Sequence, residues 1–258
     1  MEVRSVRVAG HFGEFLQGLL GPSGPVALVT LPCPALAATA RRGGADALDP
    51  AMRARLVAAL NAADDPNIGV SVEMPPGAGA GASTSSLIAL ARALGAEAAA
   101  IPAACLAAEG AVDPTMLPRP AEALWASREA RVIETLPSPP AFEVVGAFFG
   151  APERTTADDG EFPDIADLIP LWRAACDADD LRKVAALASL SAERTTAMRG
   201  PKGDPVSALA EKLGALGWAR AHTGSARALL FAPGAAPDGA EDAMRGAGGS
   251  QAIRFRTP

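Results

Sequence analysis

The sequence has little cysteine, little histidine and no long apolar run, and each shortage excludes a class of protein. Its three cysteines, Cys33, Cys105 and Cys176, are widely separated, and none forms a Cys-x-x-Cys pair. An odd number of widely separated cysteines is not typical of a disulfide framework, and structural zinc sites need closely spaced ligands such as a Cys-x-x-Cys pair. We therefore expect neither, and we expect the three thiols to be reduced and buried.

Positive charge is also scarce. The 258 residues carry a formal net charge of -6 and contain no block of Lys or Arg, and the isoelectric point is near 5.0. Nucleic acids and anionic membrane surfaces attract basic patches, so we expect neither as a partner. No stretch approaches the roughly 18 apolar residues that a membrane span needs. We expect a cytoplasmic protein, either a monomer or a homodimer.

With 49% hydrophobic and 20% charged residues, the chain can bury one large core or two modest ones. Apolar spacing predicts strands near residues 3–8, 25–31, 68–74, 142–149, 226–231 and 253–255, and helices over 52–63, 87–94, 102–109, 165–175, 180–190 and 206–216. Because strands and helices do not alternate regularly, the predicted class is α+β. The proline-rich run 136–140 predicts a boundary between a domain of residues 1–138 and one of residues 139–258.

The segment 75–86, Pro-Pro-Gly-Ala-Gly-Ala-Gly-Ala-Ser-Thr-Ser-Ser, places alternating glycines before a hydroxyl-rich helix start. Backbone N–H groups and the positive end of a helix together form an anion site. No Lys follows the last glycine, so the segment is not a P-loop, and its Ser/Thr-rich helix start does not fit a dinucleotide fingerprint. A nucleotide phosphate fits better. A flexible Gly/Ala turn with an ordinary Ser N-cap is the alternative.

Two further glycine-bearing clusters carry polar side chains. Residues 10–18, Gly-His-Phe-Gly-Glu-Phe-Leu-Gln-Gly, are expected just after the first strand, and they place His11, Glu14 and Gln17 where polar groups normally line a site. Residues 221–225, Ala-His-Thr-Gly-Ser, offer another close backbone approach before a predicted strand. The only two histidines lie in these two clusters, either for chemistry or as structural hydrogen-bonding groups.

The order of these three clusters resembles the GHMP kinase superfamily over essentially the whole chain. Within it, residues 13–18, 79–84, 113–115 (Asp-Pro-Thr) and 221–225 are most similar to the L-threonine kinases of cobalamin and propanediol metabolism. The resemblance implies an N-terminal domain like the second domain of ribosomal protein S5 and a ferredoxin-like C-terminal domain. ATP and substrate would then lie in the cleft between the two domains.

The resemblance also implies an activity, the Mg-ATP-dependent transfer of a phosphoryl group to a hydroxyl. L-Threonine is the first acceptor that it implies. Glu14 and Asp113 would be catalytic, and Ser83, Thr84 and Glu14 would hold Mg²⁺. The remaining residues that the resemblance implies are Pro76, Gly77, Gly79, Gly81, Ser83, Thr84 and Ser85 for the nucleotide, and His11, Gln17, Thr115, His222, Thr223, Gly224 and Ser225 for the acceptor.

The chain departs from related threonine kinases at two positions where they tend to carry acids, since it has Ser86 and Met116. These departures weaken the threonine assignment more than they weaken nucleotide binding. The alternatives are a GHMP kinase for homoserine, a sugar or an isoprenoid alcohol, and a nucleotide-binding regulator that has lost catalysis. A structural or interaction protein would leave the three glycine clusters unexplained.

Overall fold

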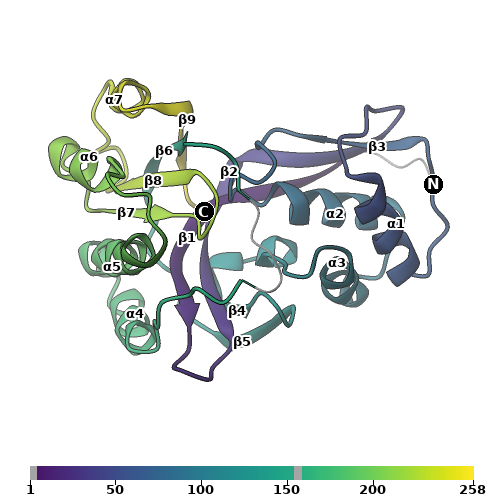
Figure 1. Ribbon diagram of the computed structural model, residues 1–258, viewed down its shortest axis with the longest axis horizontal. Helices are drawn as coiled ribbons and strands as arrows, with labels where there is room; N and C mark the ends of the chain where they lie inside the picture. Colours follow the sequence, from purple (N-terminus) through teal and green to yellow (C-terminus); the bar gives the residue numbers. More distant parts are fainter. Residues whose placement is uncertain (1–4, 154–158) are drawn as a thin grey trace.

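The computed structural model describes residues 5–153 and 159–258. Two long strands, β1 (Val6–Leu19) and β2 (Val26–Arg42), form an antiparallel pair at the centre of the molecule (Figure 1). The other strands are β3 (Ile68–Val72), β4 (Ala123–Ala126), β5 (Arg131–Thr135), β6 (Glu143–Phe149), β7 (Gly217–Arg220), β8 (Ala226–Phe231) and β9 (Gly249–Arg256). They form one sheet in the order β5-β4-β2-β1-β7-β8-β6-β9, with β3 paired to β2.

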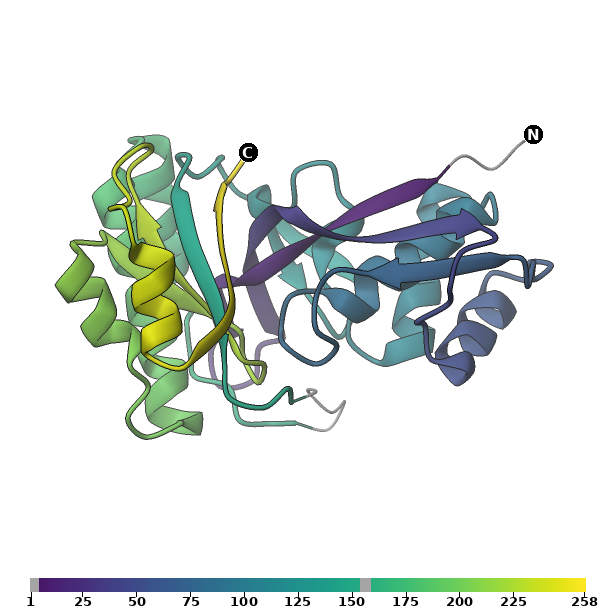
Figure 2. The ribbon, with the colours of Figure 1, turned by 90° about the horizontal axis from the view of Figure 1, so that it is seen from above.

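The helices divide into two groups on either side of this central pair. Helices α1 (Pro50–Ala59), α2 (Ala82–Ala93) and α3 (Ile101–Glu109) lie at the N-terminal end of the molecule. Helices α4 (Leu168–Asp177), α5 (Leu181–Arg199), α6 (Val206–Leu213) and α7 (Ala240–Gly246) lie at the other end, and Figure 2 shows the two groups apart from each other. The predicted α+β class is therefore confirmed.

Strand β1 joins the cores beneath these two helix groups. Val8 belongs to an N-terminal core with Leu56 and Leu87, whereas Phe12 and Phe15 belong to a second core that includes Trp172. Each of these side chains is at most 2% exposed. The sheet is therefore continuous through both halves, and the division at residues 138 and 139 stays a proposal.

One expectation about β1 was wrong. Residues 10–18 were expected to follow the first strand, but they lie within β1. The strand continues because its pairing with β2 shifts register between Ala9 and Gly10, between His11 and Glu14, and between Glu14 and Leu16. Such irregularities absorb extra residues without ending a strand, so a glycine-rich run that resembles a turn can remain in the sheet.

Most other predicted elements are present, with shifted ends. The helix expected over 180–190 continues to Arg199, the strand expected over 68–74 ends at Val72, and the strand over 226–231 has the predicted bounds. Strands β4 and β5 were not predicted. Part of the extended segment expected at residues 3–8 lies outside the described residues. None of the described helices is both long and apolar enough to cross a membrane.

Candidate active site

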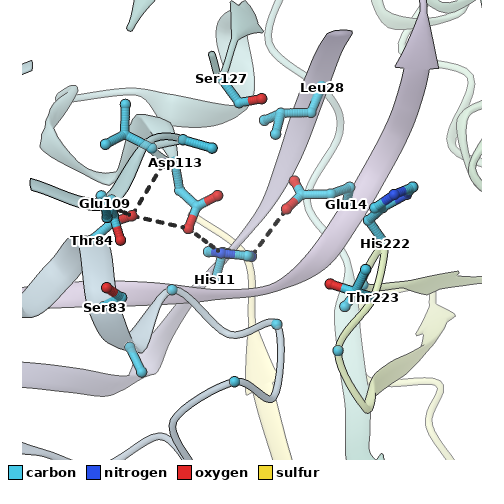
Figure 3. A pocket seen from close by; sticks show the side chains of 18 of the residues that line it. His11, Glu14, Leu28, Ser83, Thr84, Glu109, Asp113, Ser127, His222 and Thr223 are labelled. Atoms are coloured by element: carbon cyan, nitrogen blue, oxygen red, sulfur yellow. Dashed lines mark hydrogen bonds and ion pairs between the residues drawn. The ribbon is translucent and has the colours of Figure 1, made fainter. Parts of the chain in front are cut away.

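A cavity of about 500 Å³ lies where the three glycine-bearing clusters meet. Its lining includes His11 and Glu14 from β1, Thr84 from α2, and His222 and Thr223 from the turn between β7 and β8 (Figure 3). Residues more than 200 positions apart in the chain therefore face one space. Polar groups that converge in a concave site are typical of ligand-binding sites.

The glycine-rich loop is fixed by the two other clusters. The amides of His11 and Gly13 donate to the carbonyls of Ala80 and Gly79, each at 3.2 Å. A Cβ atom at Gly79 would lie 2.2 Å from the Ala221 Cβ, and one at Gly81 would lie 2.6 Å from Cδ2 of His11. Glycine is therefore needed at both positions by packing, in addition to any approach of a ligand.

The loop backbone also needs glycine for its conformation. Gly77, Gly79 and Gly81 have φ angles of 76°, 75° and 75°, in the left-handed region. Gly81 is the N-cap of α2, so the ordinary Ser N-cap of the alternative interpretation is absent. The first amides of any helix lack partners within the helix. The loop therefore ends at a helix N-terminus that lies at the cavity, where an anion can bind.

Only two of the four hydroxyl groups at the start of α2 face the cavity. Ser83 and Thr84 line it. The hydroxyl of Ser85 donates to the carbonyl of Ala9 at 3.1 Å, and the hydroxyl of Ser86 donates to the carbonyl of Ala82 at 2.6 Å. Ser85 is fully buried. The geometry therefore gives Ser85 a structural role, although the sequence predicted a nucleotide contact there.

Thr84 lies between two carboxylates. Its hydroxyl donates to Oε1 of Glu109 at 2.5 Å, and Oδ2 of Asp113 lies 3.3 Å from the same oxygen (Figure 3). Glu109, the last residue of α3, was not predicted as a site residue. An acidic side chain is unfavourable at a helix C-terminus, and this local conflict is the one signal in the sequence that could have indicated its role.

His11 lies between Glu14 and the same Asp113 carboxylate. Its Nδ1 is 3.3 Å from Oε1 of Glu14, and its Nε2 is 3.0 Å from Oδ2 of Asp113. In a regular strand, residues three apart face opposite sides of the sheet. Gly13 adopts a φ of 75° between them, and the accompanying register shift allows both side chains to reach the cavity. The bulge therefore creates the cluster.

The charges in this cluster depend on one another. Burial alone would lower the pKa of His11, but the charges of Asp113 and Glu14 outweigh burial and raise it to about 9. Burial raises the pKa of Glu14 to about 8, against the opposing charge of His11. Burial acts to raise the pKa of Asp113, but His11 and the Thr84 hydroxyl outweigh burial and hold this pKa below its ordinary value. At neutral pH the cluster therefore contains an imidazolium.

The second histidine has different neighbours. The ring of His222 stacks on Phe162 with centroids 3.8 Å apart and an interplanar angle of 3°. The guanidinium of Arg128 lies 5.2 Å from the centre of the Phe162 ring. His222 Nε2 is 3.4 Å from Oδ2 of Asp159. Burial, together with the charge of Arg199, lowers the pKa of His222 to about 4, so this imidazole is neutral.

The remaining predicted residues are divided between the cavity and its surroundings. Gln17 and Gly224 line the cavity, whereas Pro76 lines a smaller adjoining pocket of about 260 Å³. Ser225 is buried, and the hydroxyl of Thr115 lies 3.5 Å from that of Ser85; neither lines the cavity. Phe162 and Arg128 do line the cavity. They were not predicted, because single residues in loops produce no periodic pattern in the sequence.

Searches against protein-family models and against curated proteins find no match. Solved structures do match. Mevalonate kinase from L. major has a TM-score of 0.62 at 13% identity over 98% of this chain and 94% of that chain. Homoserine kinase from Cytophaga hutchinsonii has a TM-score of 0.61 at 15% identity, again over 98% and 94%. This chain has the GHMP kinase fold. A structure described as a phosphotransferase related to the CoA biosynthesis pathway also matches the GHMP fold of this chain, with a TM-score of 0.62 at 12% identity over 98% of this chain and 95% of that chain.

Proposed function

We propose that this chain is an ATP-dependent kinase that transfers the γ-phosphoryl group to the hydroxyl of a small molecule. One observation carries the proposal: the glycine-rich loop and the N-terminus of α2 open into the same cavity as the Thr84 hydroxyl and the carboxylates of Glu109 and Asp113. An anion site beside a cluster of oxygen ligands is what a magnesium nucleotide needs. The likeness to solved mevalonate and homoserine kinases agrees with it.

In this proposal the nucleotide phosphates bind along the loop. Gly77, Gly79 and Gly81 allow close approach of the backbone, and the first amides of α2 supply donors at the positive end of the helix. The loop is already fixed against β1 by two hydrogen bonds, so little conformational entropy is lost on binding. Pro76 and Ser85 would act through the shape of the loop.

The residues around Thr84 suit Mg²⁺. Its hydroxyl, the carboxylate of Glu109 and that of Asp113 are oxygen donors, which Mg²⁺ prefers. Ser83 lies next to them on α2. Glu14 was expected to be a further ligand, but it lies on the far side of the His11 ring from Asp113. When bound, Mg²⁺ would neutralise charge on the phosphates, and the protein's ligands would be Thr84, Glu109 and Asp113.

The transfer itself needs mainly positioning and charge. The acceptor oxygen attacks the γ-phosphorus, the bond from that phosphorus to the bridging oxygen breaks, and ADP leaves with the bonding electrons. The acceptor proton goes to a carboxylate of the cluster or to water. Asp113, whose pKa is lowered by His11, and Glu14 are the proposed carboxylates. His11 supplies a fixed positive charge between them.

L-Threonine is the acceptor that we propose first, because motifs 13–18, 79–84, 113–115 and 221–225 resemble those of L-threonine kinases. Ser86 and Met116 lack the acids that related enzymes carry, but Glu109 and Asp113 supply two carboxylates beside Thr84. Homoserine, a sugar and an isoprenoid alcohol are the alternative acceptors. A regulator that binds ATP without turnover is the second candidate, favoured by the two missing acids.

The test is release of ADP from Mg-ATP with and without L-threonine, with phosphorus NMR of the product. Thr84→Ala should lower kcat at least 100-fold, because it removes the hydroxyl between two carboxylates, and Ser83→Ala/Thr84→Ala should abolish turnover. Ser71→Ala, an exposed position on β3, is the control. Wild-type rates in the double variant would overturn the proposal. ATP binding without turnover on any alcohol would favour the regulator.

A further inference from the structure

The lining of the cavity contains more carboxyl groups than cations. Among the residues that the structure describes, the acidic side chains that line it are Glu14, Asp49, Glu109, Asp113 and Glu153. No lysine of the chain lines it. A magnesium nucleotide still carries net negative charge on its phosphates, and phosphoryl transfer depends on positive charge beside them. The proposed reaction therefore needs a cation from the few basic side chains at the cavity.

Most of these basic side chains have other partners. His11 faces two carboxylates, at 3.3 Å and 3.0 Å. His222 is neutral, because burial together with a neighbouring arginine lowers its pKa to about 4. The guanidinium of Arg128 lies 5.2 Å from the centre of an aromatic ring and donates to a backbone carbonyl. Of the basic side chains that line the cavity in the described part of the chain, Arg55 remains.

Arg55 lies on α1, and one hydrogen bond holds its guanidinium. Its Nε donates to the carbonyl of Ala108 at 2.8 Å. The next residue is Glu109, which accepts from the Thr84 hydroxyl. The two Nη atoms of Arg55 carry four more N–H donors, and these have no hydrogen bond or ion pair with any residue that the structure describes. A forked, unneutralised donor is therefore held beside the proposed Mg²⁺ ligands.

Arg53, on the same helix, shows what a structural arginine looks like in this chain. Its guanidinium donates to the carboxylates of Asp46 and Asp64, and its side chain is 11% exposed. Residues two apart on a helix face different directions, whereas residues three apart lie on one face. Arg55 accordingly lines the cavity together with Met52, and Arg55 is exposed. Its charge is therefore available to a ligand.

We infer that Arg55 binds the terminal phosphate of the magnesium nucleotide and makes the site selective for a nucleoside triphosphate over a diphosphate. A planar guanidinium binds phosphate oxygens in pairs. The bond to Ala108 places Arg55 next to Glu109, and a metal held by Glu109 and Thr84 would bridge the β- and γ-phosphates. The terminal phosphate is thus the one expected at Arg55. This inference rests on the proposed kinase function.

Capping of α3 is the competing explanation for the contact between Arg55 and Ala108. Helix α3 ends at Glu109, an acid at the unfavourable end of a helix, and an arginine that donates to a carbonyl of the last turn offsets this. A capping role alone would affect the stability of the fold. It would not distinguish between nucleotides that differ only in their number of phosphates.

The test is calorimetric binding, with Mg²⁺ present, of a non-hydrolysable ATP analogue, ADP, AMP and adenosine to the wild type and to Arg55→Gln. The variant should raise Kd for the ATP analogue about 10- to 100-fold, because it loses hydrogen bonds to a charged group. Kd for ADP should rise by less than about threefold, and Kd for AMP and adenosine should stay within about twofold. The ratio of Kd values for the ATP analogue and adenosine cancels any general effect on the fold.

Arg92→Gln is the matched control. Arg92 is an exposed arginine on α2 that donates to the carbonyl of Met116 at 3.0 Å, and it does not line the cavity. Its Kd values should equal those of the wild type. Arg55→Lys keeps the charge but loses the fork, so its loss for the ATP analogue should lie between those of the wild type and Arg55→Gln. This second variant tests the same contact if Arg55→Gln does not fold.

The outcomes separate the two proposals. If Arg55→Gln weakens adenosine as much as the ATP analogue, or leaves both unchanged, the inference is overturned and the kinase proposal stands. If the wild type binds no ATP analogue, the kinase proposal fails and the inference fails with it. A loss for the ATP analogue that is absent for adenosine and absent in Arg92→Gln would support phosphate binding by Arg55, whichever alcohol is the acceptor.

Discussion

The two histidines of this chain line one cavity, and their surroundings give them different charge states, one positive and one neutral. His11 lies between Glu14 and Asp113, which raise its pKa to about 9. His222 is stacked on Phe162 near Arg199, and burial lowers its pKa to about 4. The side chains of His11 and His222 are only 4% and 10% exposed, so burial alone does not explain why their charges differ. The sign of the neighbouring charges makes the difference between the two histidines.

This difference in charge suits the two histidine-bearing parts of the cavity to different roles. The wall at His11 carries a positive charge between two carboxylates and adjoins the glycine-rich loop, which suits the handling of phosphates. The wall at His222 offers the flat, neutral ring of His222 stacked on Phe162, which suits contact with the carbon skeleton of an acceptor. Three measurements test this contrast between the two histidines.

His11→Gln should cost the most stability, because it leaves the buried carboxyl group of Glu14 and the partly exposed carboxylate of Asp113 without their cation. Loss of one partner from a buried ion pair costs roughly 3–5 kcal/mol, whereas His222→Gln exchanges one neutral group for another and should cost about 1 kcal/mol. Urea denaturation at pH 7 measures both. Glu14→Gln added to His11→Gln should restore part of the loss. Equal costs at the two positions would remove the contrast.

Gly79→Ala tests the packing that holds the two walls together. A methyl group there would lie 2.2 Å from the Ala221 Cβ, at a backbone φ of 75°. Overpacking and left-handed backbone together should cost roughly 2–4 kcal/mol. Gly95→Ala is the matched control, since Gly95 has a φ of 80° with open space around it, and should cost about 1 kcal/mol. Similar melting temperatures for the two variants would contradict tight packing at the loop.

The pH dependence of stability should have opposite signs at the two histidines. The folded-state pKa of His11 is above its ordinary 6.5, so its contribution is complete below pH 6.5 and is lost as the pH rises through about 9. The folded-state pKa of His222 is below 6.5, so its contribution is complete above pH 6.5 and is lost as the pH falls through about 4. The pKa of Glu14 is raised from 4.5 to about 8, so its contribution is complete below pH 4.5 and is lost as the pH rises through about 8.

Urea denaturation of the metal-free protein between pH 4.5 and pH 9 checks this sign. His222→Gln should flatten the acid side of the stability curve and leave the alkaline side unchanged. His11→Gln should flatten the alkaline side. A variant that changes the other side of the curve from the one predicted would contradict the assigned charge state of that histidine.

Local pattern was sufficient for much of the fold. The period of apolar residues predicted the helices over 206–216 and 102–109 and the strand over 226–231 to within a few residues, because each element buries one face whatever its neighbours are. The alternating glycines identified the loop at 77–81, since their conformations are local. Strands β4 and β5 were not predicted, because they are short and their formation depends on partner strands distant in sequence.

The sequence alone specified many of the chemical groups of the site: three glycine-bearing clusters, the carboxyl groups of Glu14 and Asp113, and the two histidines. Their relative positions were set by the tertiary structure. It brought Glu109 to the Thr84 hydroxyl, used a bulge at Gly13 to turn His11 and Glu14 into the same cavity, and gave the histidines opposite pKa shifts. Charge interactions depend on distance and burial, and distances between remote residues exist only once the chain has folded.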